Sequence, residues 1–278
     1  MVTPELFLPD DRLEYFSIPN NKIKESAEGV VALFTEGMLA HHGNGIYLPK
    51  KQYIKAECGG QLRPLCDDEQ FRGQPSGAIL TGVLVSEDVI VTTNHGLPAS
   101  DSQITKILFV FDFRFTDEQS EGKILKENIF RGKCVIKRGV GSADFALIRL
   151  NRKAPAQRVR KIKSAGIELL DGRLAYVLGH PCGLPLKFGG TVTVRDVNGE
   201  DFFRADFDTY IRNSGSPVFD LESHEVIGIV TRDNAEDFVP DNGNNCCRSN
   251  VVTPSHLSGD ECVKASLFSG FISHDCPS

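Results

Sequence analysis

Three short segments of the chain carry side chains that together could hydrolyse an acyl bond. They are Thr-Asn-His-Gly around His95, Ala-Asp-Phe-Ala-Leu around Asp144, and Asn-Ser-Gly-Ser-Pro around Ser214. A serine hydroxyl is a weak nucleophile at neutral pH, so it needs a neighbouring base and an acid that orients that base. The order histidine, aspartate, serine therefore predicts a nucleophile with both of its partners. Ser216 is the competing hydroxyl in the third segment.

Strands must bring these three segments together. Short runs of β-branched, aromatic and other apolar residues, separated by turns, predict strands over 83–85, 89–93, 109–115, 144–150, 174–178, 191–197, 202–208, 217–220 and 226–231. His95 follows the second of these strands, Asp144 begins the fourth, and Ser214 precedes 217–220. The near-alternation in Phe109–Phe115 places four phenylalanines on one face. Many short strands at regular spacing predict an all-β sandwich or a pair of barrels.

The expected organisation is one domain with two lobes. Residues 1–26 form an N-terminal extension, 27–155 a first β-barrel, and 156–278 a second β-barrel with a terminal helix. A basic, proline-marked connection divides the lobes. The glycine- and charge-rich stretch 41–68 is expected to be loop. Capping residues from Ser258 onward, followed by helical spacing of apolar residues, predict that the chain closes with a helix.

Composition limits the kinds of partner. The net charge is −6, which argues against nucleic acid or an anionic membrane as the main partner. No apolar run is long enough for a transmembrane helix. The histidine pair His41-His42 and the pair His274 and Cys276 lack the spacing of zinc sites, so neither a metal nor another cofactor is expected.

The eight cysteines favour an oxidising compartment, whereas the start of the sequence shows no signal peptide, and this conflict stays open. Sequence alone does not choose among the cysteine pairings. One arrangement would tie the C-terminal lobe together internally, through the adjacent Cys246 and Cys247 with Cys262 and Cys276.

The three segments resemble those of the trypsin-like serine peptidases of the chymotrypsin fold, particularly the bacterial branch around glutamyl endopeptidase. The Thr-Asn-His and Asn-Ser-Gly-Ser-Pro runs carry this resemblance, and Gly179-His180-Pro181 and Val226–Val230 are also similar. The resemblance covers most of the chain, from Val30 to the final helix. The fold that it implies is two antiparallel six-stranded β-barrels packed with the active site between them.

The same resemblance implies roles for the residues. His95 would be the general base, Asp144 its orienting acid and Ser214 the nucleophile of a serine endopeptidase that forms an acyl-enzyme. The backbone N–H groups of Arg212 and Ser214 would form the oxyanion hole. The implied partner is a protein or peptide substrate, and the implied state is a secreted or periplasmic bacterial monomer. Intracellular action would account for the missing leader equally well.

The resemblance also locates a specificity pocket. Asp208 stands six residues before Ser214, where trypsin-type enzymes carry the acid that selects arginine or lysine. Thr231 ends the strand expected to line the pocket, and Asp233 follows it, where it would add negative potential. Glutamate specificity fits poorly with these acids. Alternatively, the alternation in Arg204–Asp208 simply places Asp208 on a solvated strand face.

Two departures from the family pattern concern the turn before Ser214. Arg212 replaces a glycine whose turn favours positive φ, a conformation that costs other residues about 1–2 kcal/mol. If the peptide flipped, the oxyanion hole would lose a donor, and the protein would be a catalytically impaired, protease-like binding protein. Asn213 replaces the aspartate that pairs with a freed amino terminus in animal zymogens, so that activation step is not expected here.

Overall fold

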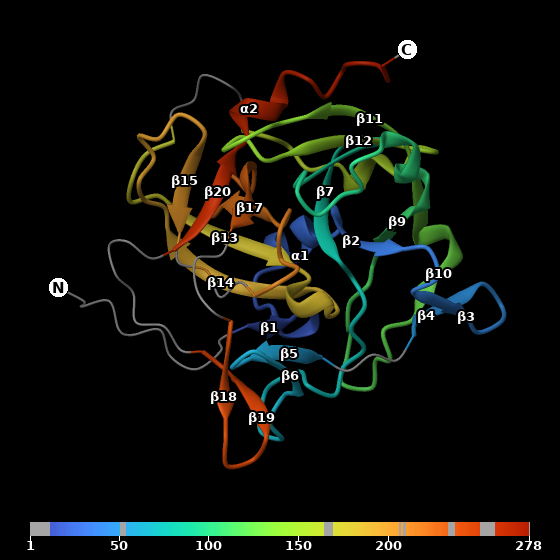
Figure 1. Ribbon diagram of the computed structural model, residues 1–278. Helices are drawn as coiled ribbons and strands as arrows, with labels where there is room; N and C mark the ends of the chain where they lie inside the picture. The colour runs from blue at the N-terminus through green and yellow to red at the C-terminus, as the bar shows by residue number, and fades with distance from the viewer. Residues whose placement is uncertain are drawn as a thin grey trace.

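Two β-sheets form the body of the molecule, a closed six-stranded barrel and a seven-stranded sheet that curls beside it (Figure 1). The computed structural model describes residues 12–50, 54–163, 169–205, 207, 210–232, 237–250 and 259–277. The expected all-β, two-lobed fold is confirmed, although the second lobe is a curled half-barrel and not a closed one. In the described part of the chain, no helix has the length and apolar character needed to cross a bilayer.

The barrel belongs to the N-terminal half. Its strands, in the order in which they pair, are β11 (Ile129–Arg138), β12 (Ala146–Leu150), β8 (Val89–Thr92), β7 (Leu80–Ser86), β2 (Val30–Thr35) and β9 (Ile107–Phe111). All neighbouring pairs are antiparallel. Apolar side chains of every one of these strands fill its interior.

The prediction of four phenylalanines on one strand face is wrong beyond Phe111. Phe109 and Phe111 point into the barrel, but β9 ends at Phe111 and Asp112 takes φ +59°. This left-handed residue breaks the alternation, and Phe113 packs edge-to-face on Phe34 outside the barrel, with ring centroids 5.3 Å apart. The Asp112 carboxylate accepts two hydrogen bonds from Arg158, at 2.6 and 3.0 Å, which stabilise the break.

The curled sheet belongs to the C-terminal half, with one strand from the N-terminal extension at its edge. The order is β1 (Leu13–Glu14), β14 (Lys187–Thr193), β13 (Leu174–Gly179), β16 (Pro217–Asp220), β17 (Val226–Arg232), β20 (Asp260–Lys264) and β15 (Phe202–Ala205). In the described part of the chain, only an isolated bridge, Arg195 to Arg204, links β15 with the segment that follows β14. The sheet therefore curls without full closure.

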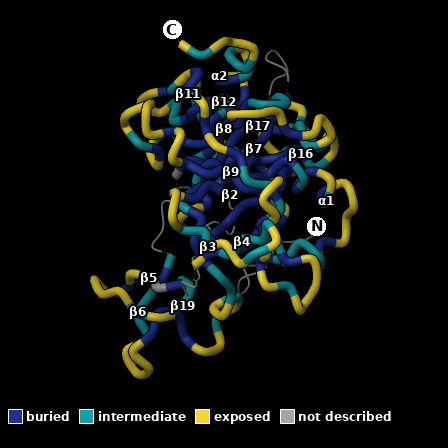
Figure 2. The backbone as a smooth tube through the Cα atoms, turned by 90° about the vertical axis from the view of Figure 1, so that its right-hand side faces the viewer, coloured by how far each residue is buried: buried dark blue, intermediate teal, exposed yellow. Residues whose placement is uncertain are grey.

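A shared apolar layer joins the two sheets. Val83, Val91 and Leu147 from the barrel pack in one cluster with Phe219 and Ile229 from the curled sheet. In Figure 2 strands β2, β7, β8, β9, β16 and β17 run through the buried middle of the molecule. The seam between the sheets is therefore a continuous hydrophobic core.

The helices are short. They are the α-helices α1 (Asn21–Ala27) and α2 (Ser266–Ser269) and the 3-10 helices η1 (Tyr15–Ser17), η2 (Asp101–Lys106), η3 (Lys126–Asn128), η4 (Ala156–Arg158) and η5 (Pro181–Gly183). The Asn20 side chain caps α1 by accepting the N–H of Lys22. The expected closing helix is confirmed as α2. It is shorter than the capping residues from Ser258 onward predicted, because 260–264 pairs as β20 with both β15 and β17.

The expectation of loop over 41–68 is also wrong, because the stretch holds paired strands. β3 (Leu39–His41) and β4 (Ile46–Pro49) pair with each other, and β4 also pairs with β10 (Ile124–Leu125). β5 (Lys55–Cys58) and β6 (Gln61–Pro64) form a hairpin through Gly59 and Gly60. Both glycines have positive φ, +59° and +72°, as a tight two-residue hairpin turn requires.

Three disulfides connect distant parts of the chain. Cys58 bonds Cys247, Cys66 bonds Cys246, and Cys134 bonds Cys276. The internal tie of the C-terminal lobe is therefore wrong, since each C-terminal partner bonds a cysteine of the N-terminal half. The first two bridges join the β5–β6 hairpin to a second hairpin, β18 (Phe238–Asp241) and β19 (Cys246–Ser249), at the bottom of Figure 1. Cys182 and Cys262 are buried and lie outside these disulfides.

Candidate active site

Strand register brings His95 and Asp144 together. Strand β8 ends at Thr92, directly opposite Ala146 at the start of β12. Because the two strands are antiparallel, the residues that follow β8 lie opposite those that precede β12. One oxygen of Asp144 accepts the backbone N–H of Asn94 at 2.9 Å and that of His95 at 3.1 Å. The other oxygen lies 2.5 Å from Nδ1 of His95.

These contacts determine which atoms of Asp144 and His95 carry a proton. The Asp144 side chain is 12% exposed, whereas that of His95 is 48% exposed. Burial acts to raise the pKa of Asp144, but the hydrogen bonds from the His95 ring and from the two backbone N–H groups outweigh it, and the pKa lies below its usual value. An ionised carboxylate can only accept, so Nδ1 carries the imidazole proton and Nε2 is left as a base.

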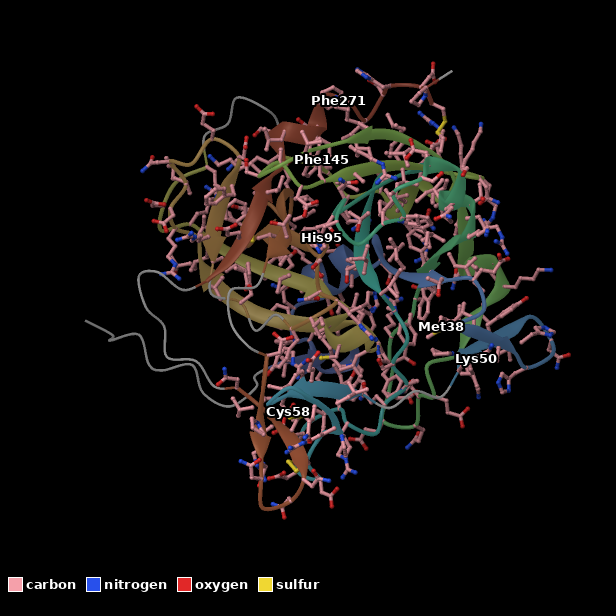
Figure 3. The ribbon with its side chains drawn as sticks, viewed as in Figure 1. Met38, Lys50, Cys58, His95, Phe145 and Phe271 are labelled. Atoms are coloured by element: carbon pink, nitrogen blue, oxygen red, sulfur yellow. A yellow bond between two sulfur atoms is a disulfide. The ribbon has the colours of Figure 1, made fainter. Side chains whose placement is uncertain are left out.

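Ser214 is hydrogen-bonded to barrel strand β7, which pairs with β8, the strand that leads to His95. Its carbonyl accepts the N–H of Thr81 on β7 at 3.0 Å. The Thr92 hydroxyl, three residues before His95, donates to the carbonyl of Thr81 at 2.6 Å. His95 itself lies between the curled sheet and the barrel (Figure 3). Ser214 and His95 therefore reach the seam from opposite lobes.

Asn213 and Ser216 hold the turn around Ser214. Both are buried, and the Ser216 hydroxyl donates to the Asn213 side-chain oxygen at 2.7 Å. The N–H of Ser216 donates to the Asn213 carbonyl at 3.0 Å. Ser216 thus has a structural role in the turn, and the partly buried Ser214 remains the candidate nucleophile.

Arg212 adopts φ +73°, the left-handed conformation expected at a position where the family has glycine. The carbonyl of the preceding Ile211 accepts the N–H of Cys182 at 2.7 Å. Because a trans peptide is planar, the Arg212 N–H points away from Cys182. Within the described residues, neither the N–H of Arg212 nor that of Ser214 donates to another main-chain group, so both can donate to the oxygen of a ligand.

The expected specificity pocket is described only in part. Asp208 and Asp233 lie outside the described residues. Thr231 is buried on β17, and its hydroxyl donates to the carbonyl of Glu261 on β20 at 3.0 Å. The Thr231 side chain is thereby fixed on the neighbouring strand.

His180 lies buried near the seam, with its N–H donated to the Thr81 hydroxyl at 3.0 Å. Its ring stacks on Phe113, and Nδ1 lies 2.9 Å from the Leu184 carbonyl. Burial lowers the pKa of His180 to about 3, so the ring is neutral and Nδ1 donates its proton to that carbonyl. This histidine packs as a core residue.

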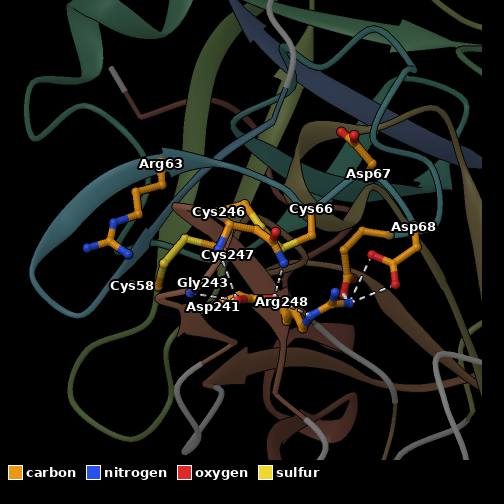
Figure 4. Close-up of a disulfide and its surroundings, with 12 residues drawn as sticks. Cys58, Arg63, Cys66, Asp67, Asp68, Asp241, Gly243, Cys246, Cys247 and Arg248 are labelled. Atoms are coloured by element: carbon orange, nitrogen blue, oxygen red, sulfur yellow. Dashed lines mark hydrogen bonds and ion pairs between the residues drawn. A yellow bond between two sulfur atoms is a disulfide. The ribbon is translucent and has the colours of Figure 1, made fainter.

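One group of potential metal ligands occurs in the described part of the chain, formed by Cys66, Asp241 and Cys246. Its two sulfurs are joined in a disulfide, so they are not thiolate ligands. The remaining carboxylate already accepts from Arg248 and from the turn at Gly243 (Figure 4).

Two residues that support the site have no signal in the sequence. Arg138 donates to the side chain of Asn94, to the carbonyl of Pro98 and to Asp101, and so braces the loop that carries His95. Asp237 accepts the N–H of Ile211 at 2.6 Å, next to Arg212. Both contacts join segments that are distant in sequence and carry no motif that could have revealed them.

Comparison with known proteins agrees with this architecture. No curated protein sequence matches the chain. Among solved structures, the VesB protease of Vibrio cholerae superposes with a TM-score of 0.54 at 13% identity, over 95% of this chain and 66% of that one. The Rv3671c protein of M. tuberculosis, in a mutant inactive form, superposes with a TM-score of 0.51 at 13% identity, over 97% of this chain and 95% of that one.

At such low identity these two superpositions establish the fold alone. The sequence model of the trypsin-like peptidase domain matches residues 80–229, which include His95, Asp144 and Ser214. This range is more than half of the chain. The protein therefore belongs to the trypsin-like peptidase family.

Proposed function

We propose that the protein is a serine endopeptidase that cleaves peptide bonds through an acyl-enzyme. The observation that carries this proposal is the bond between the Asp144 carboxylate and Nδ1 of His95, which leaves Nε2 free as a base at the seam that Ser214 also reaches. The family itself acts on proteins and peptides, which supports this substrate class.

In this mechanism Nε2 of His95 takes the proton from the Ser214 hydroxyl while Oγ forms a bond to the substrate carbonyl carbon. The carbonyl electron pair moves onto oxygen, where the N–H groups of Arg212 and Ser214 stabilise the charge. The intermediate then collapses, the C–N bond breaks, and His95 returns the proton to the leaving amine. Water repeats these steps to release the acid and restore Ser214.

The test is labelling with an organophosphonate or sulfonyl fluoride probe, read by mass spectrometry of the modified peptide. We expect an adduct on Ser214 in the wild-type protein and none in Ser214→Ala. Ser216→Ala tests the competing hydroxyl. The adduct should stay on Ser214, because the Ser216 hydroxyl is buried and donates to Asn213. A folded wild-type protein without an adduct on Ser214 would refute the peptidase proposal.

The impaired-binder alternative makes an opposite prediction for Arg212→Gly. If Arg212 disabled the oxyanion hole, glycine would raise turnover strongly from a background near zero. Arg212 already has the required positive φ, and its N–H points away from Cys182, so no observation favours this alternative. We expect the Arg212→Gly variant to hydrolyse peptides at nearly the wild-type rate, measured as kcat with a fluorogenic peptide.

For specificity we propose cleavage after arginine or lysine, with Asp208 selecting the basic side chain and Thr231 and Asp233 contributing to the pocket. This proposal rests on the spacing to Ser214 and on the resemblance to trypsin-type enzymes. A peptide panel varied at the residue before the cut tests it, with Asp208→Asn as the variant. Preference for glutamate or an apolar residue would refute the pocket and leave the peptidase activity intact.

We further propose a secreted or periplasmic bacterial monomer, related to the glutamyl endopeptidase branch, with lobes 27–155 and 156–278 after the extension 1–26. The three disulfides support an extracytoplasmic location, because such bonds persist in oxidising compartments. A thiol count of the purified protein under denaturing conditions should find two free thiols among eight cysteines. Eight free thiols would contradict the location.

A further inference from the structure

We infer that Asp237 is a positioning residue that holds the oxyanion-hole donors in place from outside both sheets. This inference rests on the proposed function and concerns the segment 210–214, which we call the oxyanion turn. Asp237 directly precedes strand β18 of the disulfide-linked hairpin. Its carboxylate accepts the N–H of Ile211 at 2.6 Å, one residue before Arg212.

Hydrogen bonds hold the peptide groups on both sides of Ile211. Its N–H donates to the ionisable Asp237, a charge-assisted bond about twice as strong as a neutral one. Its carbonyl accepts the N–H of Cys182 at 2.7 Å. The side chain of Ile211 is 61% exposed, so packing contributes little to its position. The two hydrogen bonds are therefore the main restraints on this residue.

These restraints determine the direction of an oxyanion donor. The Ile211 carbonyl and the Arg212 N–H belong to one planar trans peptide and point in opposite directions. Rotation of that peptide would turn the Arg212 N–H away and bring the carbonyl round in its place. Arg212 has a left-handed φ that costs about 1–2 kcal/mol, so the turn needs outside support. Asp237 supplies it from the N-terminal side of Ile211.

The hairpin in turn fixes Asp237. The N–H of Asn250, beyond β19, donates to the carbonyl of Asp237 at 2.9 Å. The adjacent Phe238 packs its ring on Tyr210, with centroids 5.5 Å apart. The hairpin thus contacts the oxyanion turn through the charge-assisted hydrogen bond of Asp237 and through the aromatic pair of Phe238 and Tyr210.

Two disulfides anchor this hairpin to the N-terminal half of the chain. Figure 4 shows the adjacent Cys246 and Cys247 bonded to Cys66 and Cys58. The N–H of Cys66 also donates to the carbonyl of Cys247 at 3.0 Å. Residues from both halves of the chain therefore support the Asp237 contact.

The test compares Asp237→Ala and Asp237→Asn with Asp241→Ala. Asp241 lies on the same hairpin, but its carboxylate bonds only Gly243, Asn244 and Arg248 within the described residues. For Asp237→Ala we expect kcat to fall by up to about 10²-fold with KM nearly unchanged, since removing one oxyanion donor outright costs about 10²–10³. Asp237→Asn keeps an oxygen acceptor and should recover part of the loss, and Asp241→Ala should match the wild type.

Binding measurements separate positioning from general damage. A peptide aldehyde forms a tetrahedral adduct that needs the oxyanion hole, whereas the product peptide does not. We expect Asp237→Ala to weaken aldehyde binding by the same factor as kcat and to leave product binding unchanged. Amide hydrogen exchange should also become faster in a peptide covering the oxyanion turn and stay unchanged in β16.

The outcomes distinguish this inference from the peptidase proposal. If Asp237→Ala and Asp241→Ala lose activity equally, if only KM rises, or if exchange in the oxyanion turn is not faster, Asp237 is not a positioning residue, although the wild type remains a peptidase. If the wild-type protein is not labelled on Ser214, the peptidase proposal fails and the inference fails with it.

Discussion

The Asp144 carboxylate accepts three hydrogen bonds, from the His95 ring and from the backbone of Asn94 and His95. An asparagine at this position would present its side-chain N–H donors to one of these partners. If the amide oxygen keeps the two backbone donors, its nitrogen faces Nδ1 and donates to it. The imidazole would then carry its proton on Nε2, where the proposed mechanism needs a lone pair.

Asp144→Asn should therefore lower kcat by about 10⁴-fold in a fluorogenic peptide assay, with little change in KM. Asp101→Asn is a suitable control, because Asp101 contacts Arg138 at the outer side of the same loop and does not contact His95. A loss smaller than about tenfold in Asp144→Asn would mean that His95 does not act as the base.

At this scale the sequence predicted residues within short motifs and missed those brought in from a distance. His95, Asp144 and Ser214 each stand in a recognisable segment at a strand edge, and the register of β8 and β12 places the first two in contact. Asp237 and Arg138 act through single hydrogen bonds whose partners are set by the path of whole loops. No local pattern encodes such a path.

Among the elements, the turn after β16 depends on a buried acid. Asp220 accepts hydrogen bonds from Arg173, including one at 3.0 Å, and from the N–H and hydroxyl of Ser223. Burial acts to raise the pKa of Asp220, but the bonds from Arg173 and Ser223 outweigh it and lower the pKa to about 2. The ordinary pKa of an aspartate carboxyl, which we take for the unfolded chain, is 3.8.

Because the pKa of Asp220 is lower in the folded protein, its carboxylate stabilises the fold at pH values above the unfolded pKa. This contribution is lost as the pH falls toward about 2. We expect Asp220→Asn to be less stable than the wild type by at least about 2 kcal/mol at pH 6, with the gap shrinking between pH 4 and pH 2. Urea unfolding across this range measures it. Glu222→Gln, an exposed neighbour in the same turn, should change stability by less than about 0.5 kcal/mol. A gap in Asp220→Asn that is constant with pH would contradict the ion-pair origin.

The paired disulfides of the hairpins should be redundant with each other. The Cys58–Cys247 bridge spans 189 residues, and closing so long a loop is worth about 5 kcal/mol. Once it exists, the Cys66–Cys246 bridge closes only a ring of about ten residues, worth roughly 3 kcal/mol. Removing either bridge by paired Cys→Ala substitution should therefore cost about 3 kcal/mol in urea unfolding, and removing both roughly 8 kcal/mol. A double removal that costs only the sum of the two single removals would contradict this redundancy.

The elements also show where sequence patterns mislead. Capping residues from Ser258 onward and apolar spacing predicted that the chain closes with a helix. The chain does close with α2, but 260–264 pairs as a strand with β15 and β17. The 41–68 stretch is rich in glycine and charge, but Gly59 and Gly60 make a hairpin that the disulfides hold. In both cases tertiary pairing decides the structure, and local propensity does not contain that information.

For the whole molecule, the decisive feature is the seam between the two sheets. Gly215, next to Ser214, has φ +87°, and its N–H donates to Val230 of the curled sheet at 2.8 Å. A Cβ at this position would overlap the carbonyl oxygen of Thr81 and the hydroxyl of Thr92, both in the barrel. The backbone beside Ser214 therefore touches both lobes with no space for a side chain.

Gly215→Ala should force the lobes apart at the site. The left-handed φ alone costs alanine about 1–2 kcal/mol, and the overlap with the Thr81 backbone adds a displacement that separates Ser214 from His95. Gly172→Ala is the matched control, because Gly172 has a similar φ of +83° with nothing within 4 Å of an added Cβ. Both variants should lose stability in urea unfolding, but only Gly215→Ala should lose peptide hydrolysis and probe labelling while it remains folded. Full activity in folded Gly215→Ala would mean that the two lobes do not need this close contact to assemble the site.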